Sequence, residues 1–239
     1  MNFKLLPLLL LVACDSGDIT ERDYEVRSEG KCVKLTATAS GLDDWSDDSH
    51  LALACFVQGN QYAVTQRILP TADGNTPISL TLTHIDSSTS TVELAITNKL
   101  RKRLLTLVSL NLEDYAESDD TIRLDLGHID LSMLGCLQRG VFDRACVQCH
   151  GANGRKAAGL DLTEGHSYAN LVNAPSTTKE GTTRVVAGNA EASLLHQILS
   201  EDGHDILHYN HTEVLSSQFK DNLEETRRLI DKWMENCGL

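Results

Sequence analysis

The segment KCVKLTATAS, residues 31–40, alternates between apolar and polar side chains, with Val33, Leu35, Ala37 and Ala39 on one side. A period of two is typical of a β-strand that buries one face. Five later segments repeat the pattern between turn-forming stretches: HLALACFV (50–57), YAVTQRIL (62–69), PISLTLTHI (77–85), STVELAITN (90–98) and LLTLVSLNL (104–112). Short strands at this spacing predict an all-β sandwich over residues 31–131.

After residue 131 the apolar spacing changes to a helical one. LSMLGCLQRGVFDRACVQCH (131–150) predicts a first helix, and NAEASLLHQILSE (189–201) predicts another, with Asn189 as its N-cap. NLEETRRLIDKWMENCGL (222–239) predicts an amphipathic last helix with two glutamates in its first turn. We therefore expect a second, helical domain over residues 132–239.

The motif CVQCH, residues 146–150, lies at the end of the first predicted helix. Two thiols three residues apart can reach the two vinyl groups on one edge of a haem, and the following histidine can bind the iron. A structural zinc site fits less well, because it needs four ligands and no second C-x-x-C is present. A redox dithiol would favour a βαβ context, which the pattern does not show.

The N-terminal segment MNFKLLPLLLLVACDSGD, residues 1–18, has one lysine before a short apolar run, which is typical of an export signal. Its LVAC stretch (11–14) resembles the lipobox of bacterial lipoproteins. That resemblance implies a signal peptide over 1–13, acylation of Cys14 and a place in the bacterial cell envelope, periplasmic or on the outer surface. The alternative is an ordinary secretory signal with an incidental cysteine. The highly charged residues 14–30 predict an acidic tether.

Export affects how the seven cysteines are interpreted, because thiols tend to pair outside the cytoplasm. Setting aside Cys14 for lipid and the motif cysteines for haem leaves four, which allow three connectivities. We favour Cys32–Cys55 and Cys136–Cys237, since each pair lies within one patterned region. Four buried free thiols are the alternative.

Four segments together resemble the class I c-type cytochromes, in the version found in planctomycetes and other environmental bacteria: GVFDRACVQCHG (140–151), AGLDLTEG (158–165), VVAGNAEASLLHQIL (185–199) and LEETRRLIDKWMENC (223–237). The resemblance implies an all-α haem domain with one covalent haem c. It implies thioether bonds to Cys146 and Cys149, and His150 as the proximal iron ligand. It also implies that the terminal helices pack together, which would bring Cys136 near Cys237.

The sequence differs from this family at the position of the sixth iron ligand, where members of the family usually have a methionine before the last helix. No methionine lies between His150 and Met234. The corresponding loop, SEDGHDILHYNHTEVLSS (200–217), offers three histidines instead. Matching EVLSS to the family pattern makes His208 the leading distal ligand, with His204 and His211 as alternatives. A five-coordinate iron is the remaining possibility.

The expected fold class is thus a two-domain chain, an all-β sandwich followed by an all-α cytochrome c-like haem domain. The expected role is one-electron transfer by an exported, lipid-anchored protein that meets the membrane through its N-terminal lipid, rather than enzyme catalysis. A formal net charge of −13 argues against a nucleic-acid partner, and no pattern identifies the redox partner. Two alternatives remain: a surface binding, adhesion or sensor protein that works through its β-sandwich, and a haem peroxidase.

Overall fold

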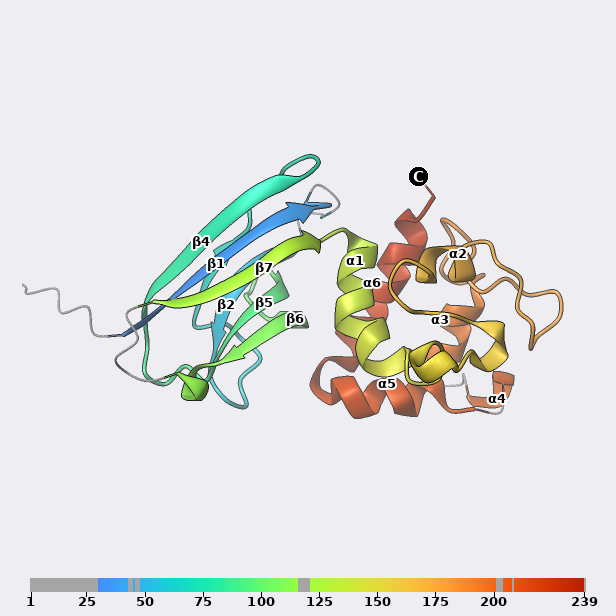
Figure 1. The fold of residues 1–239 in the computed structure, drawn as a ribbon. Helices are drawn as coiled ribbons and strands as arrows, with labels where there is room; N and C mark the ends of the chain where they lie inside the picture. Colours follow the sequence, from blue (N-terminus) through green and yellow to red (C-terminus); the bar gives the residue numbers. More distant parts are fainter. Residues whose placement is uncertain are drawn as a thin grey trace, which may run out of the picture.

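The structure is a computed structural model that describes residues 30–42, 45, 48–115, 121–200, 204–207 and 209–238. The described chain has a β-sheet half and a half of short helices, and these lie end to end (Figure 1). The predicted signal peptide, Cys14 and nearly all of the predicted tether lie outside the described residues. Among the described helices, none is both long and apolar enough to cross a membrane.

Two sheets make up the β half. In the three-stranded sheet, β1 (Lys31–Ser40) is central, antiparallel to β4 (Thr76–Ile85) and parallel to β7 (Ile122–Asp130). The four-stranded sheet is antiparallel throughout, and its order is β3 (Thr65–Ile68), β2 (Ser49–Phe56), β5 (Thr91–Asn98) and β6 (Arg103–Asn111). A short 3-10 helix, η1 (Leu112–Asp114), follows β6.

The alternation in the sequence explains how the two sheets share a core. Val33 and Leu35 of β1 and Leu94 of β5 are fully buried in the same hydrophobic cluster. Ala37 and Ala39 of β1 are buried as well, whereas the residues that alternate with them are only partly buried, so the strand buries one face. The strands expected from the period-two pattern are confirmed in all six segments.

The second half contains mostly short helices. The α-helices are α1 (Met133–Leu137), α2 (Ser167–Leu171), α3 (Leu194–Leu199), α4 (His204–Leu207), α5 (His211–Phe219) and α6 (Leu223–Asn236). A π-helix, η2 (Gln138–Cys146), continues α1, and three 3-10 helices are η3 (Ala152–Gly154), η4 (Ala157–Gly159) and η5 (Lys220–Asn222). The longest helix in the described part of the chain is α6, with 14 residues.

The predicted fold class is wrong, because the second half is not an all-α cytochrome c-like domain. The described chain contains two β-sheets, and its helices are short apart from the C-terminal α6. Between residues 151 and 193 the chain is rich in Gly, Thr, Ser and Asn, which favour turns over helix. It forms turns and isolated bridges there, such as Val172 with Val185. Asn189 is not an N-cap, since α3 begins after Ser193.

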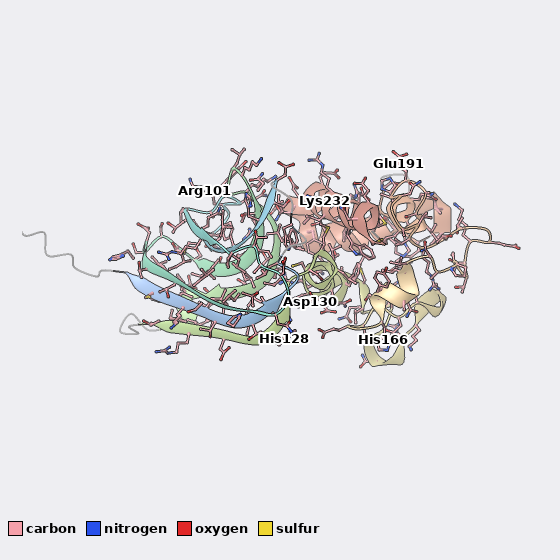
Figure 2. The ribbon with its side chains drawn as sticks, turned by 90° about the horizontal axis from the view of Figure 1, so that it is seen from above. Arg101, His128, Asp130, His166, Glu191 and Lys232 are labelled. Carbon is pink, nitrogen blue, oxygen red and sulfur yellow. The ribbon has the colours of Figure 1, made fainter. Side chains whose placement is uncertain are left out.

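The junction between the halves is short, and a hydrogen bond to the side chain of Asp130 holds it. Asp130, the last residue of β7, accepts a hydrogen bond from the Ser132 amide at 2.9 Å, and Ser132 in turn caps α1. Figure 2 shows Asp130 between the β half, where Arg101 lies, and the helical half, where His166 and Glu191 lie.

The helix that leads to the CVQCH motif packs directly on β6. A side chain at Gly140 would place its Cβ 2.5 Å from Cδ2 of Leu105, so glycine allows this close approach. Four residues further on, Arg144 donates a hydrogen bond from Nη2 to the carbonyl of Leu107 at 3.2 Å. A second tie joins Lys102, just before β6, to Glu225 of α6 through an ion pair. The sheet therefore supports the helices that surround the candidate site.

Candidate cofactor site

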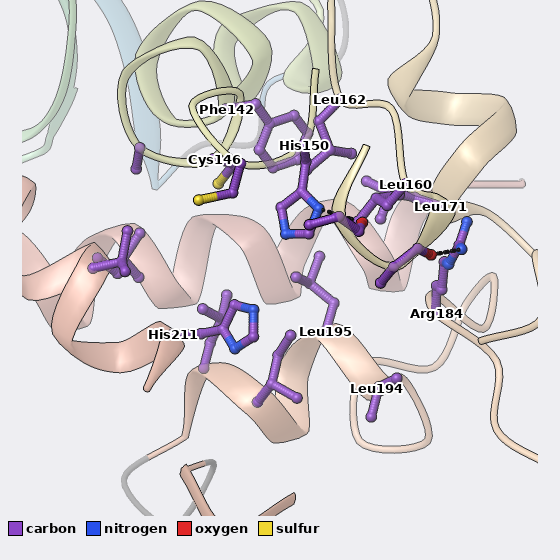
Figure 3. Close-up of a pocket in the computed structure, with 18 of the residues that line it drawn as sticks. Phe142, Cys146, His150, Leu160, Leu162, Leu171, Arg184, Leu194, Leu195 and His211 are labelled. Atoms are coloured by element: carbon purple, nitrogen blue, oxygen red, sulfur yellow. Dashed lines mark hydrogen bonds between the residues drawn. The ribbon is translucent and has the colours of Figure 1, made fainter. Parts of the chain in front are cut away.

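A cavity of about 310 Å³ opens among η2, α3, α5, α6 and the loop after residue 150. Figure 3 shows Cys146, His150 and His211 around it together with aliphatic and aromatic side chains. Most of its lining is apolar, including Val141, Phe142, Leu160, Leu162, Leu195 and Ile230. A cavity of this size with few polar groups is typical of a site for a largely apolar ligand.

All three chemical groups of the CVQCH motif reach this cavity: the side chains of Cys146, Cys149 and His150 line it. Cys146 ends η2, and its carbonyl accepts hydrogen bonds from the amides of Cys149 and His150 at 3.1 and 3.0 Å. This tight turn brings the two cysteines and the histidine to one end of the helix. The sequence spacing therefore translates into a single cluster at the cavity wall.

The thiol of Cys146 is not an activated one. Burial raises its pKa to about 12, and the nearby Cys149 and Asp143 act in the same direction. Cysteines in redox dithiols and thiolate nucleophiles have pKa values lowered by positive surroundings. Cys146 is consequently a neutral thiol at physiological pH.

His150 is held by the backbone in one tautomer. Its Nδ1 lies 2.9 Å from the carbonyl oxygen of Ala157, which can only accept, so Nδ1 carries the hydrogen. Nε2 is then the unprotonated nitrogen and is free to bind a metal. Desolvation lowers the imidazole pKa, which favours this neutral form. After His150 the chain turns at Gly151, where a Cβ would lie 2.5 Å from Cγ2 of Thr163.

His211, the first residue of α5, faces His150 across the cavity (Figure 3). The two ring centroids are 6.4 Å apart, and the ring planes differ by 12°. Nδ1 of His211 lies 3.2 Å from the carbonyl oxygen of Tyr209, so the ring is held in the same way as that of His150. Desolvation lowers the pKa of His211 as well.

The described part of the chain does not include the side chains of the other two predicted distal candidates. His208, the leading candidate, lies outside the described residues, and so does the side chain of His204 in α4. Among the side chains that the structure describes, His211 is the loop histidine that lies opposite His150.

Arg184 is a cavity residue that the sequence analysis missed. Its Nη1 donates to the carbonyl of Asn170 and its Nη2 to the carbonyl of Ala158, both at 2.9 Å. These bonds fix a positive charge at the rim of an apolar cavity, where it could pair with an acidic group of a ligand. No spacing in the sequence distinguishes Arg184 from other arginines, because turns rather than a regular element position it.

The four remaining cysteines fall into two pairs of different geometry. Cys32 of β1 is partly buried and belongs to the three-stranded sheet, whereas Cys55 of β2 is buried in the four-stranded sheet, and both are thiols. Cys136 of α1 and Cys237, directly after α6, are both buried, and α1 contacts α6. Cys237 is a thiol whose Sγ donates to the Met234 carbonyl at 3.3 Å. Neither predicted disulfide is formed in the structure, and both pairings stay predictions for the oxidised protein.

Comparison with known proteins adds no relative: no family model, no curated protein and no solved structure matches the chain.

Proposed function

We propose that this chain binds one haem covalently through Cys146 and Cys149, with His150 as an iron ligand, and that it transfers single electrons. The observation that carries the proposal is the apolar cavity into which both thiols and the imidazole open from one helix end. The haem would supply the redox-active iron. The attachment motif supports the resemblance to c-type cytochromes, and the fold does not.

The donor set of the cavity fits such a group. Each thiol can add across one vinyl group, so that sulfur bonds to one carbon, hydrogen goes to the other and no atom is lost. His150 presents Nε2 as a ligand, since Nδ1 is bonded to the Ala157 carbonyl. Arg184 offers a cation for a haem carboxylate at the rim. The aliphatic lining excludes water, which favours retention of a flat apolar ring.

The elevated pKa of Cys146 also separates this proposal from redox dithiol chemistry. A disulfide oxidoreductase depends on a cysteine with a lowered pKa, whereas burial raises the pKa of Cys146 to about 12. Addition to a vinyl group in an assembly reaction does not require a thiolate that persists in the folded protein.

Covalent attachment can be tested by expression in a bacterial host that assembles c-type haem. We expect haem to stay with the wild-type chain through acid–organic extraction and to be lost on extraction from Cys146→Ala/Cys149→Ala. Cys55→Ala is a matched control, because it removes a buried thiol of the β half and leaves the motif intact. Extraction of haem from the wild type would refute the proposal.

Lipid anchoring at Cys14 forms part of the proposed role, and it is supported by the N-terminal sequence pattern alone. An acyl anchor would hold the carrier at a membrane surface, because each buried methylene contributes about 0.8 kcal/mol. Cys14→Ser should move the protein from the membrane fraction to the soluble fraction, with its haem content unchanged. A variant that stays with the membrane would remove this part of the proposal.

A further inference from the structure

The inference concerns His211 and rests on the proposed function. Two imidazoles face each other across the cavity, one from the end of the CVQCH turn and one from the first turn of α5. Their planes are within 12° of parallel, and their centroids are 6.4 Å apart. Nothing in the motif itself predicts a second histidine in this place, since His211 lies 61 positions after His150 in the sequence.

Both rings present Nε2 to the cavity, because Nδ1 is bonded to a backbone carbonyl in each of them. Nδ1 of His150 donates to the Ala157 carbonyl at 2.9 Å, and Nδ1 of His211 donates to the Tyr209 carbonyl at 3.2 Å. A backbone acceptor on Nδ1 is the usual support of a histidine that binds metal through Nε2. Each imidazole is therefore prepared as a neutral Nε2 donor.

The separation of the rings suits one metal between them. A nitrogen–metal bond of about 2 Å and a ring radius of about 1.2 Å place the centroids of two opposed imidazoles about 6 to 6.5 Å apart. The centroid distance of 6.4 Å lies in this range. Two imidazole rings in direct contact would have centroids much closer together. The gap between the rings of His150 and His211 is therefore large enough for the plane of a haem.

The ring of His211 is also fixed from its outer side. The ring of Tyr209 packs edge-on against it, with centroids 4.9 Å apart and planes at 70°. Asn210 caps α5 by accepting a hydrogen bond from the Glu213 amide at 2.8 Å, and this fixes the start of the helix that carries His211.

We infer that His211 is the second axial ligand of the haem iron, so that the protein is a bis-histidine c-type haem protein. The ligand comes from the N-terminus of α5 and not from the methionine position of the class I cytochromes. Haem iron with two imidazole ligands is low-spin and closed to carbon monoxide, and a second imidazole gives a lower potential than a thioether ligand. This arrangement favours electron transfer over peroxidase chemistry, which needs an open iron position.

The assignment is tested on the holoprotein by absorption and electron paramagnetic resonance spectra, with haem content measured in parallel. We expect the wild type to be low-spin in both oxidation states and slow to bind carbon monoxide. His211→Ala should give high-spin ferrous iron that binds carbon monoxide at once. His211→Met should keep the iron six-coordinate and raise the potential, which separates loss of a ligand from loss of folding.

His208→Ala and His204→Ala are the matched controls from the same segment, and both should keep the wild-type spectrum. A wild type that carries covalent haem but is high-spin would overturn the assignment while leaving the proposed function in place. The same holds if His208→Ala opens the iron and His211→Ala does not. A wild type without covalent haem would overturn the proposed function, and the axial assignment would fall with it.

Discussion

The β half and the helical half are stabilised by different kinds of contact. In the β half, long ladders of backbone hydrogen bonds join the strands, and even the buried carboxylate of Glu93 is paired, with Arg103 at 2.7 Å. In the helical half, side chains such as Arg184 hold irregular turns by bonding to backbone carbonyls. The candidate cofactor cavity lies in the irregular half, because short helices joined by turns leave an apolar space that a ligand can complete.

The largest expected effect follows from that difference and depends on the proposed haem. Without covalent haem, the Cys146→Ala/Cys149→Ala chain should lose amide-exchange protection in α3 and α5 by orders of magnitude, because their apolar side chains line the cavity. Strands β1 and β5 should keep their protection. Hydrogen exchange with mass spectrometry gives both values, and equal loss in the two halves would contradict the comparison.

Two phenylalanines, each only 1% exposed, distinguish the two halves by their expected effect on the haem spectrum. Phe142 lines the cavity and packs edge-on against Trp233, with ring centroids 6.3 Å apart. Phe142→Ala should lower the free energy of unfolding by about 3–5 kcal/mol and shift the haem spectrum. Phe56→Ala in the β half should cost a similar amount and leave the haem spectrum unchanged. Denaturant titration and absorption spectra test this pair, and a spectral shift in Phe56→Ala would count against it.

Gly140 tests the contact through which the two halves meet. Gly140→Ala would place Cβ within 2.5 Å of Leu105 Cδ2, and overpacking of this kind costs about 1–3 kcal/mol. Adding Leu105→Ala removes the clashing atoms, so the coupling energy in a double-mutant cycle should be favourable. A strictly additive cycle would show that η2 does not rest on β6.

The smallest expected effect is that of the ion pair between Lys102 and Glu225, worth about 0.5–1 kcal/mol. Desolvation is the largest single effect and raises the pKa of Glu225, but the hydrogen bond from Lys102, a backbone hydrogen bond and the charges of Lys102 and Arg228 together outweigh it, so the pKa lies below its ordinary value. A depressed folded-state pKa means that this stability is present above pH 4.5 and is lost as the pH falls through the folded pKa. Glu225→Gln should therefore weaken the acid dependence of unfolding, and an unchanged dependence would contradict the pairing.

Different parts of the molecule could be predicted from the sequence to different extents. Six strands were predictable because alternation shows directly which face is buried. Strand β7 was not, since Ile122 and Ile129 are its only buried residues and Gly127, with a φ of +59°, interrupts the pattern. The extent of helix was overestimated between residues 151 and 200, where turn-forming residues limit α2 and α3 to five and six residues.

The three groups of the CVQCH motif could be predicted from their spacing in the sequence, whereas the distal histidine and Arg184 could not. CVQCH placed three groups at one helix end because consecutive residues cannot separate in space. The choice among His204, His208 and His211 could not be made from spacing, since it depends on where α5 begins and on the Tyr209 carbonyl that orients the ring. Arg184 reaches the cavity through turns whose geometry no periodicity shows.

Covalent haem on the CVQCH motif can be detected by mass spectrometry of the tryptic peptide that spans residues 145–155, ACVQCHGANGR. We expect this peptide at its own mass plus that of one intact haem, because both thiols add to vinyl groups without loss of atoms. An unmodified dithiol peptide, or the same peptide two hydrogens lighter as a disulfide, would contradict it.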